Sequence, residues 1–150
     1  MMRKIAANYV FPVSSPPVRN GIVVVNDQGR IMDLIDPGGC FREMAMLVFY
    51  NGVLIPSFVF PDTGKDNNIS ENDLFEILAK LTPPGNREKN TQDDFDRLLK
   101  KFTLDKAEQL GLQNLSGSLE KGKKPGILLI SPFDFERWQP AEGAVVKKIV

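Results

Sequence analysis

The order of the apolar patterns along the chain restricts its fold more than any other feature. Segments with strand character fill residues 1–59, segments with a helical period follow, and strand character returns after Gly117. Strands from both ends of a chain can join one β-layer, against which the intervening helices pack. The sequence therefore predicts an α+β fold: a small β-sandwich built from N- and C-terminal strands, with two or three helices inserted between them.

The predicted strands are rich in valine and isoleucine, and turn-forming residues separate them. Ile22–Val25 is apolar throughout, which is typical of a strand covered on both faces. Asp27–Gly29 has the length and the glycine of a short hairpin loop. Strands are predicted at residues 4–13, 21–26, 30–35, 53–59, 127–130 and 143–150.

Helical periodicity begins at residue 70 and ends at Gly111, the predicted C-terminal glycine of the last helix. Capping patterns at Ser70–Asp73 and Thr91–Asp94 open the first two helices, and a third begins at Thr103. We expect the apolar stripe of each helix to face the core. These stripes are 74, 77, 78 and 81 in the first helix, 95, 98, 99 and 102 in the second, and 104, 107 and 110 in the third.

At 150 residues the chain has the length of a single domain. We expect residues 1–59 to supply the N-terminal strands, residues 60–111 to form the helical insert and residues 112–150 to supply the C-terminal strands.

The chain contains no histidine. A Ser-His-Asp triad, a Cys-His pair and an imidazole metal site are therefore excluded. We expect no bound metal and no cofactor, and the missing histidines favour a protein that is not an enzyme.

Charge and cysteine content restrict the partners and the compartment. Nineteen basic residues balance nineteen acidic ones, so no net field attracts nucleic acid or an anionic membrane. The single cysteine, Cys40, has no partner for a disulfide within the chain, which fits a reducing compartment. No apolar core of signal-peptide length precedes Asn8, and no apolar run approaches the ~20 residues of a membrane span. We expect a cytoplasmic protein without nucleic-acid or membrane partners.

One motif resembles a phosphate-binding loop. Gly117–Lys123 matches G-x-x-x-x-G-K, but Lys124 follows instead of serine or threonine. Pro125 and a strand then stand where a helix N-terminus must begin. We interpret the motif as the turn-rich segment that leads into the strand at Ile127.

Two stretches of the chain carry patterns that occur together in one enzyme family. The matching segments are Ala7-Asn8-Tyr9-Val10, Asn20–Val25, Gly29–Ile31 and Asn51–Pro56 in the first stretch, and Thr103–Gly111 and Gly117–Gly126 in the second. They resemble the flanks of the amidohydrolase superfamily of metal-dependent hydrolases and deaminases, and they occur in the family's order. The resemblance implies that the two stretches fold together into a small β-sandwich. In the family this sandwich lies beside a TIM barrel that holds the metals.

The barrel that the resemblance would imply is absent. In the family a glycine, an acidic or amide residue and a His-x-His pair follow the last matching segment. Here Ser57 replaces the glycine, Phe60 the acidic or amide residue, and Asp62 and Gly64 the histidines. A barrel needs about 250 residues, and only residues 60–102 separate the two stretches. We therefore interpret the chain as a degenerate amidohydrolase-like protein without catalytic activity.

Asp62 and Asp66 are the weak catalytic candidates that remain. Asp62–Leu81 resembles the end of the family's last barrel strand, where an aspartate binds metal and takes a proton from water. Either aspartate matches that position, and a zinc site would still lack its other protein ligands. The alternative function is therefore a residual metal-independent or carboxylate-based hydrolase activity.

Three aromatic residues, Phe133, Phe135 and Trp138, lie in a segment predicted to be a loop. Large apolar side chains in a loop need cover. They either close the edge of the sandwich or anchor an interface of the kind enriched in Phe and Trp. They are the candidate interface residues.

Loss of the barrel would uncover the apolar sandwich face that packs against it in the family. The helices at 70–81 and 91–102 would cover this face, or another subunit would. We expect an interaction, scaffold or self-associating domain, with a homo-oligomer or an intact amidohydrolase paralogue as the possible partner. A deletion relic without a selected role fits the sequence as well.

Overall fold

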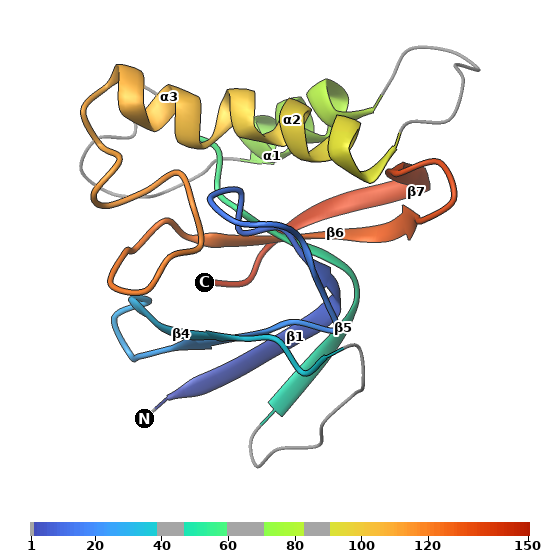
Figure 1. The fold of residues 1–150 in the computed structure, drawn as a ribbon. Coiled ribbons are helices and arrows are strands. Elements are labelled where there is room, and N and C mark those ends of the chain that lie inside the picture. Colours follow the sequence, from blue (N-terminus) through green and yellow to red (C-terminus); the bar gives the residue numbers. More distant parts are fainter. Residues whose placement is uncertain (1, 39–46, 60–70, 83–90) are drawn as a thin grey trace.

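The computed structural model describes residues 2–38, 47–59, 71–82 and 91–150. Strands come from both ends of the chain and helices from between them, which confirms the predicted α+β fold (Figure 1). None of the described helices is long and apolar enough to cross a membrane. The elements are β1 (Arg3–Val10), β2 (Val18–Arg19), β3 (Ile22–Val25), β4 (Ile31–Ile35), β5 (Leu47–Pro56), α1 (Glu71–Leu81), α2 (Gln92–Phe102), α3 (Leu104–Gln109), β6 (Ile127–Asp134) and β7 (Gln139–Lys148).

The strands form one mixed sheet in the order β4-β3-β1-β5-β6-β7, and β2 pairs with β1. β5 connects its two halves: Leu47 begins a parallel pairing with β1, and Val53 begins an antiparallel pairing with β6. In Figure 1 the N-terminal strands β1 to β4 form a lower leaf, and β6 and β7 form an upper leaf beneath the helices.

Apolar side chains fill the space between the two leaves and a second space beneath the helices. One core cluster joins Ile5 and Val23 of the N-terminal leaf to Ile127 and Leu129 of β6. A second cluster joins the helices to the other face of β5, β6 and β7. It contains Ile77 and Leu81 from α1, Phe95 and Leu99 from α2, and Val53, Leu128, Ile130 and Val146 from the sheet. The sandwich with helices at its side is thus confirmed.

The helical predictions hold for α2 and, over its described residues, for α1. Thr91 caps α2 with a capping box, in which its side chain accepts a hydrogen bond from Asp94 N at 3.1 Å. Ser70, the predicted start of the first helix, lies outside the described residues. The prediction that Leu110 of the third helix faces the core is wrong. Helix α3 ends at Gln109, and the chain turns away through Gly111, whose φ is 73°. Leu110 is exposed as a result.

Two strands are longer than predicted. β5 begins at Leu47 instead of Val53. Asn51-Gly52 has the composition of a turn, but the strand continues through it, and the Asn8 side chain accepts the hydrogen bond from Gly52 N at 2.7 Å. β6 continues to Asp134 and β7 begins at Gln139, so Phe133 lies in a strand rather than a loop. Two prolines had lowered the strand signal there, and one of them, Pro132, falls where the β6/β7 register shifts.

Candidate functional site

Six aromatic rings meet at one end of the sheet. Tyr9 comes from β1, Phe11 follows that strand, and Phe95 comes from α2; Phe133, Phe135 and Trp138 come from the β6/β7 hairpin. Neighbouring rings lie at centroid distances of 5.0 Å for Phe11 and Phe95, 5.0 Å for Phe95 and Phe133, and 5.1 Å for Tyr9 and Trp138. Edge-to-face pairs of this kind add to the free energy of apolar burial.

The cluster runs from the core to the surface. Phe11, Phe95 and Phe133 are buried, and Tyr9, Phe135 and Trp138 are half-buried. We call these three half-buried residues, Tyr9, Phe135 and Trp138, the aromatic patch. The buried rings of Phe11 and Phe133 contact the patch from the core side.

The hairpin holds Trp138 in an unusual backbone conformation. Asp134 Oδ1 accepts hydrogen bonds from Glu136 N at 3.0 Å and Arg137 N at 3.1 Å, which sets the turn. Trp138 follows with a φ of 51°. Such a left-handed conformation costs a non-glycine residue about 1–2 kcal/mol. The ring contacts of Trp138 with Tyr9 and Phe135 must offset this cost.

Two arginines lie close to the patch in the chain or in the sheet. Arg19 is the register partner of Tyr9 in the β1/β2 pair, so the two side chains leave the same face. Arg137 precedes Trp138. Both arginines are exposed, and neither takes part in the ion pairs found within the described part of the chain.

The structure brings the three candidate interface residues together and adds Tyr9 and Arg19 to them. Sequence reasoning placed Tyr9 in a strand but had no means to join it to a hairpin more than a hundred positions away. The available signal was that Tyr9 and Phe11 alternate within the strand predicted at residues 4–13, which puts both rings on one face. Whether the residues anchor an interface remains a prediction.

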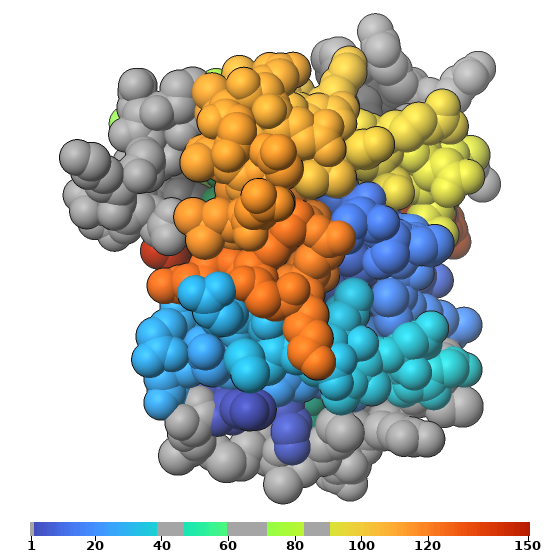
Figure 2. Space-filling view, turned by 60° about the vertical axis from the view of Figure 1, so that its left-hand side comes forward, coloured from blue at the N-terminus to red at the C-terminus, as the bar shows by residue number. Residues whose placement is uncertain are grey.

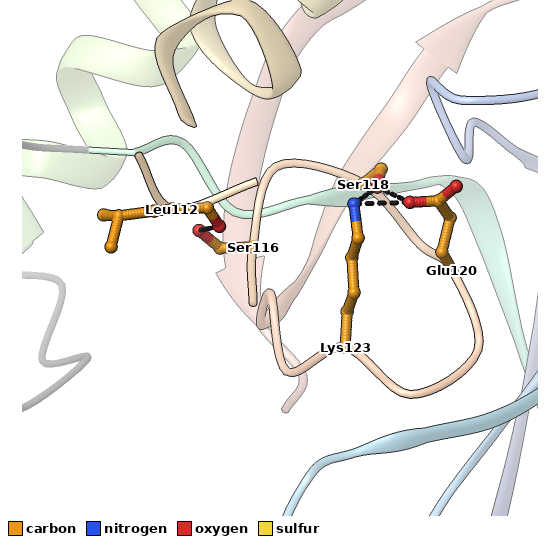
Figure 3. Close-up of polar contacts among 5 residues, drawn as sticks. All are labelled: Leu112, Ser116, Ser118, Glu120 and Lys123. Atoms are coloured by element: carbon orange, nitrogen blue, oxygen red, sulfur yellow. Dashed lines mark hydrogen bonds and ion pairs between the residues drawn. The ribbon is translucent and has the colours of Figure 1, made fainter. Parts of the chain in front are cut away.

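Apart from the aromatic rings, three polar side chains, Ser118, Glu120 and Lys123, meet in the loop between α3 and β6 (Figure 3). Lys123 Nζ donates to Ser118 Oγ at 2.6 Å and forms an ion pair with Glu120. Ser118 Oγ donates in turn to Glu120 Oε2 at 2.8 Å. Hydrogen bonding from Lys123 lowers the pKa of the Glu120 carboxyl, and Ser118 and Ser14 contribute to the same effect.

The Ser118 and Lys123 pair contains the groups of a serine nucleophile and a lysine base. Lys123 Nζ is held by an ion pair with the Glu120 carboxylate and by its hydrogen bond to Ser118 Oγ. Ser118 is fully buried, so a substrate has no access to its hydroxyl. The cluster therefore stabilises the loop rather than forming a catalytic site, and we call its three residues, Ser118, Glu120 and Lys123, the lock.

The lock holds the loop against the N-terminal leaf. Gly122 N donates to Ile31 O at 2.8 Å, Ile31 N donates to Lys123 O at 2.9 Å, and Leu119 N donates to Pro12 O at 3.0 Å. Figure 2 shows the orange loop segment lying against the blue and cyan N-terminal strands. Because these bonds use the Gly122 amide, the motif that resembles a phosphate-binding loop serves as a connection between the leaves.

No cluster of three or more His, Cys, Asp or Glu side chains that could hold a metal occurs in the described ranges. The weak catalytic candidates, Asp62 and Asp66, and the single cysteine, Cys40, lie outside those ranges. The hydrolase alternative therefore stays a prediction.

Comparisons with known proteins leave the family open. No protein-family model matches the chain, and no curated protein is similar to it at a significant level. Among solved structures, the crystal structure of A. niger ochratoxinase is similar in part, with 15% identity and a TM-score of 0.29. The similarity covers 67% of this chain and 22% of that chain, so the chain spans less than a quarter of that protein's length. This likeness carries nothing about activity.

Proposed function

We propose that the chain is a non-catalytic interaction domain that binds a partner protein through the aromatic patch and the two arginines beside it. The observation that carries the proposal is the conformation of Trp138. Its backbone has a left-handed φ of 51°, and its side chain is half-buried at the surface. Glycine would form the same turn without strain. Retaining tryptophan there keeps a large, rigid ring at the surface.

The composition of the site supports the proposal. Tryptophan, tyrosine and arginine are the residues that most often carry the binding energy of protein interfaces. The patch supplies Trp138, Tyr9 and Phe135 above buried rings. Arg19 lies opposite Tyr9 in the β1/β2 pair, and the exposed Arg137 precedes Trp138 in the chain. A preformed patch loses little side-chain entropy on binding. The sequence resemblance makes an intact amidohydrolase paralogue the first partner to test.

The test is affinity purification of the tagged chain from its native lysate, with the wild type and three variants compared by mass spectrometry. Trp138→Gly removes the ring and suits the left-handed backbone, so the hairpin keeps its turn. Phe75→Ala is the matched control, because Phe75 is an aromatic residue outside the cluster that is 75% exposed.

We expect the wild type and Phe75→Ala to retain one stoichiometric partner and Trp138→Gly to lose it. Arg19→Glu should weaken the same complex without reaching the core, since Arg19 is exposed. Equal recovery by the wild type and Trp138→Gly would show that the patch is not the binding surface. Recovery of no partner by any form would refute the interaction role.

A further inference from the structure

The polar atoms of the aromatic patch are left open by the described part of the chain. The Trp138 indole N–H and the Tyr9 hydroxyl form no hydrogen bond with any described residue. Both side chains are half-buried, and neither polar atom is completely buried among the described residues. Tyrosine and tryptophan are common at interfaces because the ring buries apolar area while its polar atom still bonds to a partner.

Arg19 places a third polar group beside the patch. It is the register partner of Tyr9 in the β1/β2 pair, so the two side chains leave the same face. Arg19 is exposed and takes part in none of the ion pairs found in the described ranges. A guanidinium and an indole N–H can only donate hydrogen bonds, and a tyrosine hydroxyl can donate or accept. The patch therefore combines aromatic rings with a surplus of hydrogen-bond donors.

A ligand that matches this surface must offer apolar groups and hydrogen-bond acceptors while bringing few donors of its own. Proline meets this requirement, because it has a backbone carbonyl but no backbone N–H. An ordinary extended strand does not, since each of its N–H groups would need an acceptor on the patch. Proline-rich segments form a polyproline II helix, which has no internal hydrogen bonds and leaves its carbonyl groups open. Such helices bind surfaces that are lined by aromatic rings.

The spacing of the rings fits a short piece of such a helix. The ring centroids are 5.1 Å apart for Tyr9 and Trp138, 5.6 Å for Tyr9 and Phe135, and 5.8 Å for Phe135 and Trp138. A polyproline II helix rises about 3.1 Å per residue, so two residues advance by about 6 Å. The patch therefore has the width of a Pro-Pro pair.

The charges of the hairpin disfavour the other ligand that aromatic rings and arginines commonly bind, a single-stranded nucleic acid. Asp134 and the exposed Glu136 lie in the same hairpin as Trp138. Their carboxylates repel a phosphate chain, and the whole chain has a net charge of +0. A proline-rich segment carries no charge, so the same carboxylates do not oppose it.

We propose that the partner segment bound by the aromatic patch is proline-rich and lies on the rings as a polyproline II helix, with a Pro-Pro pair against them. This inference rests on the proposed partner binding and specifies its chemistry. Carbonyl oxygens of the segment accept hydrogen bonds from the Trp138 indole N–H, the Tyr9 hydroxyl and the Arg19 guanidinium. Because the helix is largely formed before binding, it loses little conformational entropy.

Titration of decaproline into the purified chain tests the proposal. Trp138 is the single tryptophan, so its fluorescence and its indole N–H signal in NMR spectra report on the patch. We expect decaproline to change both signals in a saturable way, with the indole N–H resonance moving to lower field as it donates to a carbonyl group. A Gly-Ser decapeptide, which keeps its backbone N–H groups, and a ten-nucleotide oligothymidylate should change neither signal.

Two variants separate the donors from the general fold. Tyr9→Phe keeps the ring and removes the hydroxyl, so it should raise the dissociation constant of decaproline by about two- to tenfold, the value of one hydrogen bond. Phe75→Ala is the control, because Phe75 is 75% exposed and lies outside the cluster, and it should leave the constant unchanged. Urea unfolding shows whether each variant is folded. If Tyr9→Phe does not fold, Arg19→Ala removes a donor at an exposed residue, with the same expected weakening.

A titration without a saturable change would overturn the proposal, as would equal affinity of the wild type and a folded Tyr9→Phe. Equal binding of the Gly-Ser peptide would overturn it too, and tighter binding of oligothymidylate would do so in favour of a nucleic-acid ligand. The lysate test is separate. A partner that Trp138→Gly loses, together with no binding of decaproline, would leave the interaction role standing and reject the proline-rich segment. Decaproline binding without any partner from the lysate would reject the interaction role and keep the ligand preference of the patch.

Discussion

Replacing Gly52 by alanine tests how closely β5 and β6 approach each other. Gly52 lies at the register shift of the β1/β5 pairing, one residue before the first β6 pair at Val53, and its φ is 134°. A Cβ atom there would overlap the carbonyl oxygen of Ile130 and lie 3.2 Å from its carbonyl carbon. The same atom would lie 3.3 Å from Leu129 Cδ1. The obstacle is mainly backbone, which cannot rotate away as a flexible side chain can.

Two costs contribute to the expected loss of stability. A φ of 134° is a conformation that glycine alone adopts readily, and it costs an alanine about 1–3 kcal/mol. Moving the Ile130 carbonyl aside disturbs the ladder at the pairs Val53↔Ile130 and Leu54↔Leu129. Losing two hydrogen bonds there costs about 0.5–1.5 kcal/mol each. The sum is about 2–6 kcal/mol, a large part of the roughly 5–15 kcal/mol that stabilises a typical domain.

Urea unfolding, followed by the fluorescence of Trp138, the single tryptophan, measures this loss. Gly143→Ala is the control, because Gly143 also has a positive φ, 78°, but no atom lies within 4 Å of its added Cβ. Gly143→Ala should show the backbone cost alone. If the two variants lose the same free energy of unfolding, the close contact between Gly52 and Ile130 is refuted.

Three further predictions concern charge and packing. Burial raises the pKa of Asp96, with a smaller effect of Asp93, so the folded state binds the Asp96 proton more tightly than the unfolded state and this group stabilises the fold as the pH falls. Asp96→Asn should therefore unfold at a higher urea concentration than the wild type at neutral pH, and the gain should shrink in acid. Hydrogen bonding from Lys123 lowers the pKa of Glu120, so Glu120 stabilises the fold above its unfolded pKa and loses that effect as the pH falls through its folded pKa. Glu120→Gln should remove this acid-side loss in urea midpoints taken from about pH 7 to pH 3. Phe133→Ala should lower the free energy of unfolding by about 3–5 kcal/mol, measured in the same assay.

Much of the fold follows from local patterns in the sequence. The stripe of Phe95 and Leu99 predicted the buried face of α2, and Thr91 with Asp94 predicted its start, because a helix and its cap involve residues three or four positions apart. The apolar run Ile22–Val25 predicted a strand covered on both faces, since each face of β3 meets its own apolar cluster. The predicted limits of β5 and β6 were wrong at Gly52 and Pro132. These residue types are rare inside strands, but the pairing in the sheet continues through both positions.

The sequence by itself determined the order of strands and helices, the buried stripes and the absence of histidine chemistry. The tertiary structure decided which distant residues meet: Tyr9 with Trp138, and Gly122 and Lys123 with Ile31. These outcomes depend on how the two ends of the chain pair into one sheet. Local preferences extend over a few residues, whereas the contacts that build the patch and hold the loop join segments far apart in the chain.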